Sequence, residues 1–203
     1  MSVLGAVIAG GASTRYGSPK ALAEVGGQRV IDRVIVAVRY VAADVVCIAN
    51  DEELGRAIGL PFRPDVRAGA GPLGGLHAAL LWAVERGDSG ILAAGCDTPF
   101  VPAELFEAVL QRSGEDVDAV LPESTGRRGV EPLSAYYAVT CLPAIIAALD
   151  RGDHRMISFH ADIRVGRVPL DVVRGIGDPD ILFLNLNTPV DRTAADRIAG
   201  GEE

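Results

Sequence analysis

The stretch that decides the fold is residues 3–22, VLGAVIAGGASTRYGSPKAL. It begins with an apolar run of strand length, residues 3–9, which stops abruptly at two adjacent glycines. A short apolar run bounded by glycine is typical of a strand that is buried on both faces. Two cations, Arg15 and Lys20, follow within ten residues of the break. We therefore expect a buried strand that ends in a glycine-rich loop carrying positive charge.

Apolar runs of strand length alternate with helical patterns along the rest of the chain. Strands are expected at residues 44–50, 90–97, 117–122, 132–142, 163–170 and 181–187. Helices are expected at residues 30–41, 52–59, 71–87, 103–112, 143–152, 155–162 and 190–199. Such alternation predicts an α/β protein whose mostly parallel sheet carries helices on both faces. Pro169 places strand 163–170 at an edge of that sheet, because proline cannot donate a ladder hydrogen bond.

This sheet architecture also indicates where a ligand would bind. Open parallel sheets bind ligands beyond the carboxyl ends of their strands, near the point where the strand order reverses. Candidate functional residues should therefore follow residues 9, 50, 97 and 187. Glycines and cations stand after the first strand, and Asn50, Asp97 and Asn187 stand at the other three places.

Length, charge and cysteine usage exclude several classes of protein. The 203 residues suit one α/β domain, and no repeat or linker divides them, so we expect a single domain over residues 1–203. A net charge of −8 disfavours a general nucleic-acid binder. The first apolar run is too short to span a membrane and has no basic segment before it, so neither an anchor nor a signal peptide is expected. Three cysteines without a CxxC pair suggest a reducing cytoplasm and no zinc site.

The loop after the first strand matches no common phosphate-binding or nucleophile motif. Lys20 stands three residues past Gly17, which excludes a Walker A loop, and the adjacent Gly10 and Gly11 exclude GxGxxG. Glycines nevertheless let main-chain N–H groups face an oxyanion. Arg15 can fork onto phosphate oxygens, and Lys20 supplies a compact charge. A phosphate loop and a surface loop with two solvated cations both remain open on these residues alone.

Asp97 follows an apolar strand directly, in GCDTPFVP at residues 95–102. A buried carboxylate is costly unless it is hydrogen-bonded or bound to a metal. One reading is a turn that Asp97 caps through Thr98. The other is a Mg²⁺ site, since Mg²⁺ binds one or two carboxylates together with substrate phosphates. The phosphate loop nearby favours the metal.

A second glycine-lined helix start occurs in GAGPLGGLHAAL, at residues 69–80. Main-chain N–H groups at Gly71 and Gly74 could bind a nucleotide there. Close packing of the helix on the sheet explains the glycines equally well. Asp65, in RPDVRAG, is able to accept hydrogen bonds from a base or ribose, whereas a simple turn aspartate is the plainer reading.

The order of these motifs resembles the MobA family, the molybdenum cofactor guanylyltransferases. The resemblance rests on VIAGGASTRYGSPKAL, RPD, GPLGGL, GCDTPFVP, VEPLSAYY, GDHRMISF and LNLNTPVD, and it spans nearly the whole chain. It implies a three-layer α/β/α sandwich with a Rossmann-like sheet of the nucleotidyltransferase type. It also implies transfer of GMP from Mg-GTP to molybdopterin, with a nucleotide-binding N-terminal half and an acceptor-binding C-terminal half.

The resemblance also implies roles for single residues. Those that would contact the nucleotide are Ile8, Ala9, Gly10, Gly11 and Asp65, while Arg15 and Lys20 would hold its phosphates and Asp97 would bind Mg²⁺. Arg155 and Asn187 would lie toward the pterin. Three departures from the family pattern stand out. Tyr16 and Pro19 replace Met and Asp in the loop, Ile48 replaces an asparagine whose role Asn50 can take, and Glu131 replaces a glutamine.

The implied chemistry is consistent with these residue types. The acceptor is a phosphate monoester that is largely dianionic at pH 7, so it needs no general base. Mg²⁺ on Asp97 would orient the α-phosphate, and the loop cations would stabilise the departing pyrophosphate. Two alternatives remain. One is a molybdopterin cytidylyltransferase or a sugar- or alcohol-phosphate nucleotidyltransferase. The other is a non-catalytic nucleotide-binding adaptor that works with other cofactor-biosynthesis or molybdoenzyme-maturation proteins.

Overall fold

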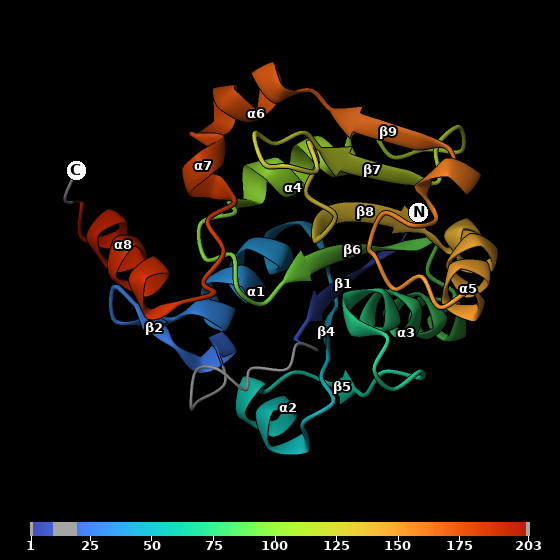
Figure 1. Cartoon of the computed structure of the whole chain (residues 1–203), viewed down its shortest axis with the longest axis horizontal. Helices are drawn as coiled ribbons and strands as arrows, with labels where there is room; N and C mark the ends of the chain where they lie inside the picture. The colour runs from blue at the N-terminus through green and yellow to red at the C-terminus, as the bar shows by residue number, and fades with distance from the viewer. Residues whose placement is uncertain (1, 10–19, 202–203) are drawn as a thin grey trace.

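The computed structural model describes residues 2–9 and 20–201 of the chain. Within these ranges a seven-stranded sheet has the order β5-β4-β1-β6-β8-β7-β9 (Figure 1). Its strands are β1 (Val3–Ile8), β4 (Val45–Ile48), β5 (Phe62–Arg63), β6 (Gly90–Gly95), β7 (Ala119–Pro122), β8 (Ser134–Ala138) and β9 (Val165–Val168). Strand β8 is antiparallel to β6 and β7, while the other neighbouring pairs are parallel. The predicted mostly parallel sheet is confirmed, and β9 lies at its edge as Pro169 indicated.

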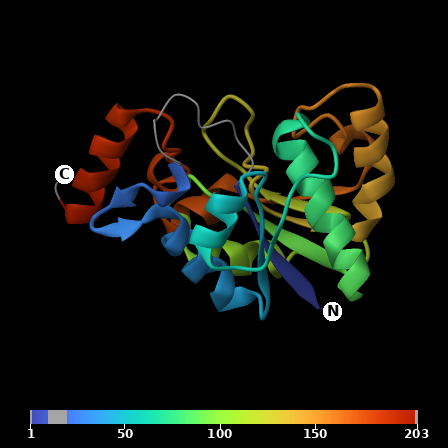
Figure 2. The same ribbon diagram turned by 90° about the horizontal axis from the view of Figure 1, so that it is seen from below.

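Helices cover both faces of the sheet, which gives the predicted three layers (Figures 1 and 2). The helices are α1 (Val30–Val41), α2 (Glu52–Ile58), α3 (Gly71–Arg86), α4 (Ala103–Leu110), α5 (Leu142–Asp150), α6 (Leu170–Ile176), α7 (Pro179–Leu182) and α8 (Pro189–Gly200). Helices α3 and α5 share one apolar cluster, whereas α1, α2, α4 and α6 share the cluster on the opposite face. Of the helices in the described ranges, none has the length and hydropathy of a membrane-spanning segment.

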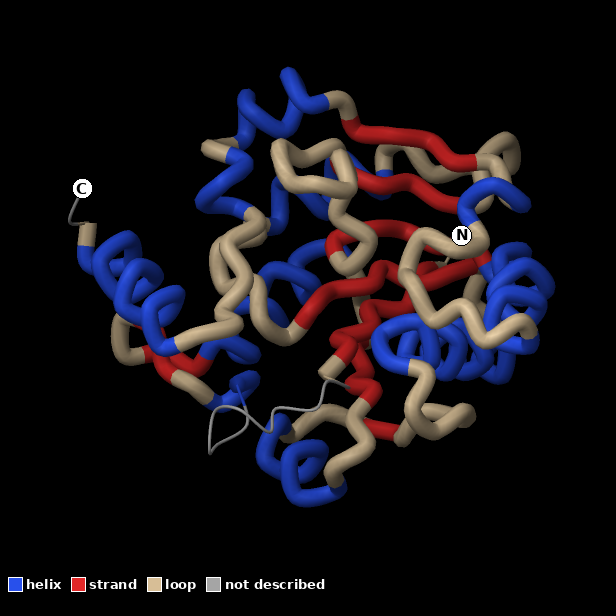
Figure 3. The backbone as a smooth tube through the Cα atoms, in the orientation of Figure 1, coloured by secondary structure: helices blue, strands red, loops and turns tan. Residues whose placement is uncertain are grey.

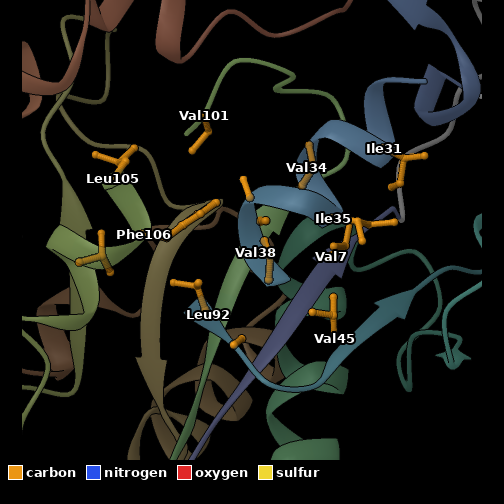
Figure 4. Packing of buried hydrophobic residues seen from close by; sticks show 14 of the residues in the cluster. Val7, Ile31, Val34, Ile35, Val38, Val45, Leu92, Val101, Leu105 and Phe106 are labelled. Carbon is orange, nitrogen blue, oxygen red and sulfur yellow. The ribbon is translucent and has the colours of Figure 1, made fainter. Parts of the chain in front are cut away.

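Strand β1 lies between these two clusters, and this position explains why its sequence is apolar throughout. Leu4, Ala6 and Ile8 join the cluster beneath α3, while Val7 joins the cluster beneath α1. A strand in a parallel sheet that is covered on both faces needs apolar side chains at every position. Figure 4 shows Val7 packed among side chains of the α1 layer. The central strand is therefore held rigidly, and its carboxyl end has a defined position.

A small satellite core joins the N-terminal and C-terminal parts of the chain. The hairpin strands β2 (Glu24–Val25) and β3 (Gln28–Arg29) pack beside α8 at one end of the molecule (Figure 1). The main-chain nitrogen of Gly26 donates to Asp196 Oδ1 at 3.0 Å. Thr188 and Asp191 form a capping box that begins α8, so the predicted last helix is confirmed. The hairpin was not predicted, because two-residue strands leave no periodic pattern.

The prediction of a strand at residues 181–187 is wrong. Asp178 caps a helical turn by accepting from the main-chain nitrogen of Asp180, and this begins α7. A loop then leads to α8 (Figure 3). The apolar residues of this segment serve two different places: Leu182 packs in the α1 cluster, and Leu186 packs in the satellite core. The apolar run therefore reflects burial at two sites and not a strand.

The predicted helix at residues 155–162 is also wrong, apart from the short 3-10 turn η3 (His160–Asp162). The segment forms successive turns, such as Ser158 N donating to Arg155 O at 3.0 Å. Phe159 is fully buried, and its ring centroid lies 6.0 Å from that of Tyr137 in β8. A loop anchored by one aromatic side chain thus takes the place of a helix here. Helix α6 was missed because the predicted strand 163–170 overlapped its start.

Candidate functional site

Three neighbouring strands, β4, β1 and β6, end at one edge of the sheet. The main chain continues their ladder beyond the strands: Ala9 N donates to Ile48 O at 2.9 Å, and Cys96 N donates to Ile8 O at 3.3 Å. From β1 the chain passes through α1 to β4 on one side, whereas β6 lies on the other side. This is the point where the strand order reverses, and it is where open α/β sheets bind ligands. The segments that follow the three strands therefore meet at this edge, as the sequence predicted.

The predicted phosphate loop lies outside the described residues. Gly10, Gly11 and Arg15 all belong to that segment. The main chain of Lys20 is described and begins the 3-10 turn η1 (Lys20–Leu22), but its side chain is not described. Ile8 and Ala9 lead into the loop from the buried end of β1. The phosphate-binding roles of the loop residues remain predictions.

Asn50 and Asp65 bind each other through two hydrogen bonds at this edge. Asn50 Nδ2 donates to Asp65 Oδ2 at 2.9 Å, and the main-chain nitrogen of Asp65 donates to Asn50 Oδ1 at 2.7 Å. Asn50 follows β4, and Asp65 follows β5 (Phe62–Arg63). The two predicted nucleotide-binding residues are therefore brought together, although 15 positions separate them. Asn50 uses both polar atoms of its amide on Asp65.

The carboxylate of Asp65 lies beside the first turns of α3, near Gly74 and Gly75. A Cβ added at Gly74 would lie 3.5 Å from Asp65 Oδ2, and one added at Gly75 would lie 3.5 Å from Oδ1. The Gly75 position is closed on its other side by Ile8, whose Cγ2 would be 2.8 Å from that Cβ. An added Cβ at Gly74 would lie 2.9 Å from Ala70 Cβ, so close packing favours glycine at both positions, and the nucleotide contact of Gly74 stays a prediction. Gly71 has a positive φ of 59°, which favours glycine at the helix start.

Two features of the environment of Asp65 shift the pKa of its carboxyl in opposite directions. Partial burial raises the pKa of the Asp65 carboxyl, because the charged form loses water. The hydrogen bond from Asn50 lowers the same pKa, because it stabilises the charged form. Oδ1 is buried and has no hydrogen-bond partner within residues 2–9 and 20–201. An unsatisfied buried acceptor costs about 1–3 kcal/mol.

Asp97 lies at the carboxyl end of β6, on the opposite side of β1 from Asp65. A Cβ added at Gly95 would lie 3.1 Å from Asp97 Oδ1, so the absence of a side chain there leaves space for the carboxylate. The hydroxyl of Thr98 donates to the carbonyl oxygen of Gly95 at 3.3 Å. The alternative reading, in which Asp97 caps its own turn through Thr98, and the metal reading both stay predictions.

Asn187 reaches the same edge from the C-terminal part of the chain. Its neighbour Leu186 donates a main-chain hydrogen bond to the carbonyl oxygen of Asp97 at 3.0 Å. The main-chain nitrogen of Asn187 donates to Asp191 Oδ2 at 2.9 Å, which ties it to the start of α8. Asn187 thus lies near Asp97 by way of a loop, and not at the end of a strand as predicted.

Arg155 lies in the exposed loop between α5 and β9. Its guanidinium binds Asp153 in a forked pair, with Nε–Oδ1 at 2.9 Å and Nη2–Oδ2 at 2.6 Å. This pair lowers the pKa of the Asp153 carboxyl to about 2. Arg155 is 76% exposed, so its position leaves it accessible to a ligand. The predicted contact with the pterin stays a prediction.

The chain is similar to known proteins in both its sequence and its structure. Residues 5–164 match the MobA-like NTP transferase domain. The chain belongs to this family. A probable molybdenum cofactor guanylyltransferase from Pelotomaculum thermopropionicum is 36% identical over 197 residues, covering 96% of this chain and 92% of the relative. The molybdenum cofactor guanylyltransferase of Rhodobacter capsulatus is 34% identical over 199 residues, covering 97% and 96%.

A solved structure supports the same assignment. Molybdopterin-guanine dinucleotide biosynthesis protein A from Archaeoglobus fulgidus matches this chain with a TM-score of 0.80 and 27% sequence identity. The match covers 98% of this chain and 100% of that chain. The fold predicted for a MobA-like nucleotidyltransferase is therefore confirmed over almost the whole length.

One departure from the family pattern lies at the functional edge of this MobA-like NTP transferase. The main-chain nitrogen of Glu131 donates to Pro122 O at 3.0 Å, at the carboxyl end of β7. Burial raises the pKa of the Glu131 carboxyl, while the nearby Ser124 hydroxyl and the charge of Arg128 act in the opposite direction. Glu131 therefore brings a half-buried carboxyl to the part of the site predicted to bind the acceptor.

Two features of the site were not predicted from the sequence. Gly75 allows α3 to pack closely on Ile8 of β1, since an added Cβ would lie 2.8 Å from Ile8 Cγ2. Its signal was present in the Gly-Gly pair of GPLGGL, of which the first glycine alone was singled out. The pairing of Asn50 with Asp65 had no sequence signal, because it depends on side-chain directions across two strand ends.

Proposed function

We propose that this chain transfers GMP from Mg-GTP to the terminal phosphate of molybdopterin and releases pyrophosphate. The product is the guanine dinucleotide form of the cofactor. The names of the relatives support this reaction. The observation that carries it is the placement of two carboxylates, Asp65 and Asp97, at the carboxyl ends of the sheet on either side of β1.

The spacing of these carboxylates suits a nucleotide that lies across the strand ends. Neighbouring strands lie about 4.8 Å apart, so the ends of β4 and β6 are separated by about 10 Å. A nucleoside monophosphate spans such a distance from its base to its phosphate. Asp65, which follows β5 and is bonded to Asn50 at the end of β4, would lie toward the nucleoside. Asp97, at the end of β6, would face the phosphates.

Asp97 fits a Mg²⁺ ion that is shared with the nucleotide. In the part of the chain that the structure describes, no group of three or more His, Cys, Asp or Glu side chains could hold a metal. Such a set would suit a resident metal, whereas Mg²⁺ on one or two carboxylates takes its other ligands from phosphates and water. When bound, Mg²⁺ would neutralise and polarise the α-phosphate.

The remaining residues bind and orient the two substrates. Arg15 and Lys20 would stabilise the negative charge of the departing pyrophosphate. The acceptor phosphate is largely dianionic at pH 7, so the chain needs no general base to activate it. The rate then comes from positioning two anions and from charge stabilisation, without a covalent enzyme intermediate.

The two halves of the chain would divide the substrates between them. The N-terminal half supplies Asn50, Asp65 and the glycine loop, and would bind GTP. The C-terminal half would bind molybdopterin through Arg155, Asn187 and the neighbourhood of Glu131. The bond between Leu186 and Asp97 joins the two halves at the expected point of phosphoryl transfer.

A substrate panel tests this function. Purified protein is incubated with molybdopterin, Mg²⁺ and each of the four NTPs, and pyrophosphate release is measured. We expect release with GTP that depends on both molybdopterin and Mg²⁺. Faster release with CTP would assign the chain to a cytidylyltransferase. Nucleotide binding without release would assign it to a non-catalytic module.

A further inference from the structure

The β7–β8 hairpin, residues 123–131, carries two arginines at its tip. Gly129 N donates to the carbonyl oxygen of Gly126 at 2.8 Å, so Arg127 and Arg128 are the two central residues of a β-turn. Gly129 follows with a φ of 67°, which is the left-handed residue that closes a three-residue hairpin loop. Both arginines are exposed. The turn therefore presents two adjacent guanidinium groups to solvent.

The β7–β8 hairpin is anchored below its tip. The main-chain nitrogen of Glu131 donates to Pro122 O at 3.0 Å, at the carboxyl end of β7. The hydroxyl of Thr125 donates to the carboxylate of Asp180 in α7. A loop that is already ordered loses less conformational entropy when it binds a ligand than a free loop does. The backbone that carries the two arginines is therefore positioned before a ligand arrives.

The hairpin lies at the functional edge of the sheet, beside Asp97. It leads to Leu133, whose carbonyl oxygen accepts from Gly95 N at 2.8 Å at the carboxyl end of β6. A Cβ added at Gly95 would lie 3.5 Å from Leu133 Cβ and 3.1 Å from Asp97 Oδ1. A second connection runs from Asp180, which binds the hairpin, to Leu186, which binds Asp97 O. Figure 2 shows the hairpin and the first turn of α3 rising on the same side of the sheet.

Other arginines of the C-terminal half near this edge already bind carboxylates. Arg155 Nη2 lies 2.6 Å from Asp153 Oδ2, and Arg167 Nη1 lies 3.3 Å from Glu123 Oε1. Arg127, in contrast, has no hydrogen bond or ion pair with another residue of the ranges 2–9 and 20–201. Its full charge is therefore available to an anionic ligand.

The charge of Arg128 is partly compensated by Glu131. The positive charge of Arg128 lowers the pKa of the Glu131 carboxyl, so the two groups are near each other. A Cβ added at Gly126 would lie 3.5 Å from Glu131 Oε1, which shows that this side chain turns back toward the β-turn. Adjacent like charges repel each other, and one carboxylate can balance only one of the two arginines. A ligand with two negative charges would balance the pair.

We propose that Arg127, together with Arg128, binds the terminal phosphate of the acceptor and holds it toward the nucleotide. This rests on the proposed guanylyltransferase function. The acceptor phosphate carries nearly two negative charges at pH 7, and arginine binds phosphate oxygens through a fork. Transfer brings this phosphate close to a second anion, so positive charge is needed on the acceptor side as well as on the nucleotide side.

The position of the hairpin in the strand order favours the acceptor over GTP as its ligand. The hairpin joins β7 and β8, which lie on one side of β6, whereas β1 and β4 lie on the other side. Asn50 and Asp65, predicted to contact the nucleotide, follow β4 and β5. An acceptor phosphate on the hairpin would thus approach Asp97 from the side opposite to the nucleoside.

The experiment measures the binding of each substrate separately by titration calorimetry. Molybdopterin and Mg-GTP are titrated in turn into wild type, Arg127→Ala, Arg127→Lys and the double variant Arg127→Ala with Arg128→Ala. We expect Kd for molybdopterin to rise about 10-fold in Arg127→Ala and about 100-fold in the double variant, with Kd for Mg-GTP unchanged. Arg127→Lys should fall between wild type and Arg127→Ala, because lysine keeps the charge but not the fork.

Arg112→Ala is the matched control. Arg112 is an exposed arginine that follows α4, and its Nη1 donates to Ala108 O at 2.9 Å. Helix α4 runs from the carboxyl end of β6 to the start of β7, so Arg112 lies at the opposite edge of the sheet. Its replacement removes the same charge from the protein and should leave Kd for molybdopterin unchanged. Circular dichroism checks that every variant is folded.

The outcomes separate this proposal from the function on which it rests. If wild type does not bind molybdopterin, the proposed function fails and the role of the hairpin fails with it. If wild type binds molybdopterin and transfers GMP to it, but the double variant binds it equally well, the role of the hairpin alone is overturned. Weaker binding of Mg-GTP alone would assign the arginines to the nucleotide phosphates, and an equal loss in Arg112→Ala would show a general charge effect. Either result would also overturn the proposal.

Discussion

The main-chain nitrogen of Leu186 donates to the carbonyl oxygen of Asp97 at 3.0 Å. This bond ties the segment before α8 to the turn that follows β6. The segment cannot shift without moving the residue to which we assign the metal. Asp97 therefore receives its position from both halves of the chain, and its side chain can be changed without removing this main-chain bond.

Asp97→Ala should remove Mg²⁺-dependent turnover while the fold persists. The variant loses the carboxylate assigned to the metal but keeps the main-chain bond to Leu186. Loss of such a ligand should reduce kcat by about 10²-fold or more. The check is pyrophosphate release over a Mg²⁺ titration, with circular dichroism to confirm folding. Turnover near that of wild type would contradict the metal assignment.

Lys20→Ala and Arg15→Lys should both weaken GTP binding and slow transfer. The first removes a compact charge, and the second keeps the charge but loses the forked geometry that arginine offers to phosphate. We expect KM for GTP to rise about 10-fold in each, measured by steady-state kinetics. Arg39→Ala is a matched control, because Arg39 is an exposed cation in the last turn of α1. Wild-type kinetics in both loop variants would show that Arg15 and Lys20 do not bind the phosphates of GTP.

Gly75→Ala should destabilise the protein although alanine favours helices. The added Cβ would lie 2.8 Å from Ile8 Cγ2, which belongs to the buried central strand and cannot move freely. The cost of overpacking is about 1–3 kcal/mol, and it exceeds a helix-propensity gain of about 1 kcal/mol. Urea denaturation measures the difference. Gly114→Ala is the control, since nothing lies within 4 Å of its added Cβ; equal stability in both variants would contradict the packing argument.

Asp118→Asn should lower stability at neutral pH and have less effect in acid. The Asp118 carboxylate accepts from Thr140 Oγ1 at 2.7 Å, and from Arg164 N at 2.9 Å, Nε at 3.0 Å and Nη2 at 2.9 Å. These donors hold the pKa of the Asp118 carboxyl well below its usual value. The stabilisation is therefore present above the unfolded pKa of about 3.9 and is lost as the pH falls toward the folded pKa.

We expect Asp118→Asn to cost about 2–3 kcal/mol at pH 7, with a smaller difference from wild type at pH 3. Urea denaturation at both values provides the measurement. Asp162→Asn removes an exposed ion pair with Arg151 at 3.9 Å and should cost less than about 1 kcal/mol. A loss that is the same at pH 3 and pH 7 would show that the Asp118 charge is not the cause.

Elements with a long, one-sided apolar pattern were predicted well from the sequence. Helix α1 begins and ends at the predicted residues, and β1 differs from its prediction by one residue. Residues 181–187 were predicted wrongly, because Leu182 and Leu186 are apolar for two separate packing reasons. The hairpin of β2 and β3 was missed because each strand has two residues.

The residues of the site were predictable one by one from the sequence, but the hydrogen bonds between them were not. Asn50, Asp65 and Asp97 were recognised by their positions after strands or in motifs. Their mutual arrangement depends on side-chain directions, which periodicity does not contain. The hydrogen bonds of Asn50 with Asp65 and the contact of Leu186 with Asp97 are such connections, and both join residues far apart in the sequence.

The most direct test of guanylyl transfer follows the label of GTP into the products. The protein is supplied with molybdopterin, Mg²⁺ and GTP labelled either at the α-phosphate or at the γ-phosphate. The account predicts that the α-label enters the pterin product and the γ-label leaves as pyrophosphate. An α-label that stays in free nucleotide, or a γ-label that enters the pterin, would contradict it.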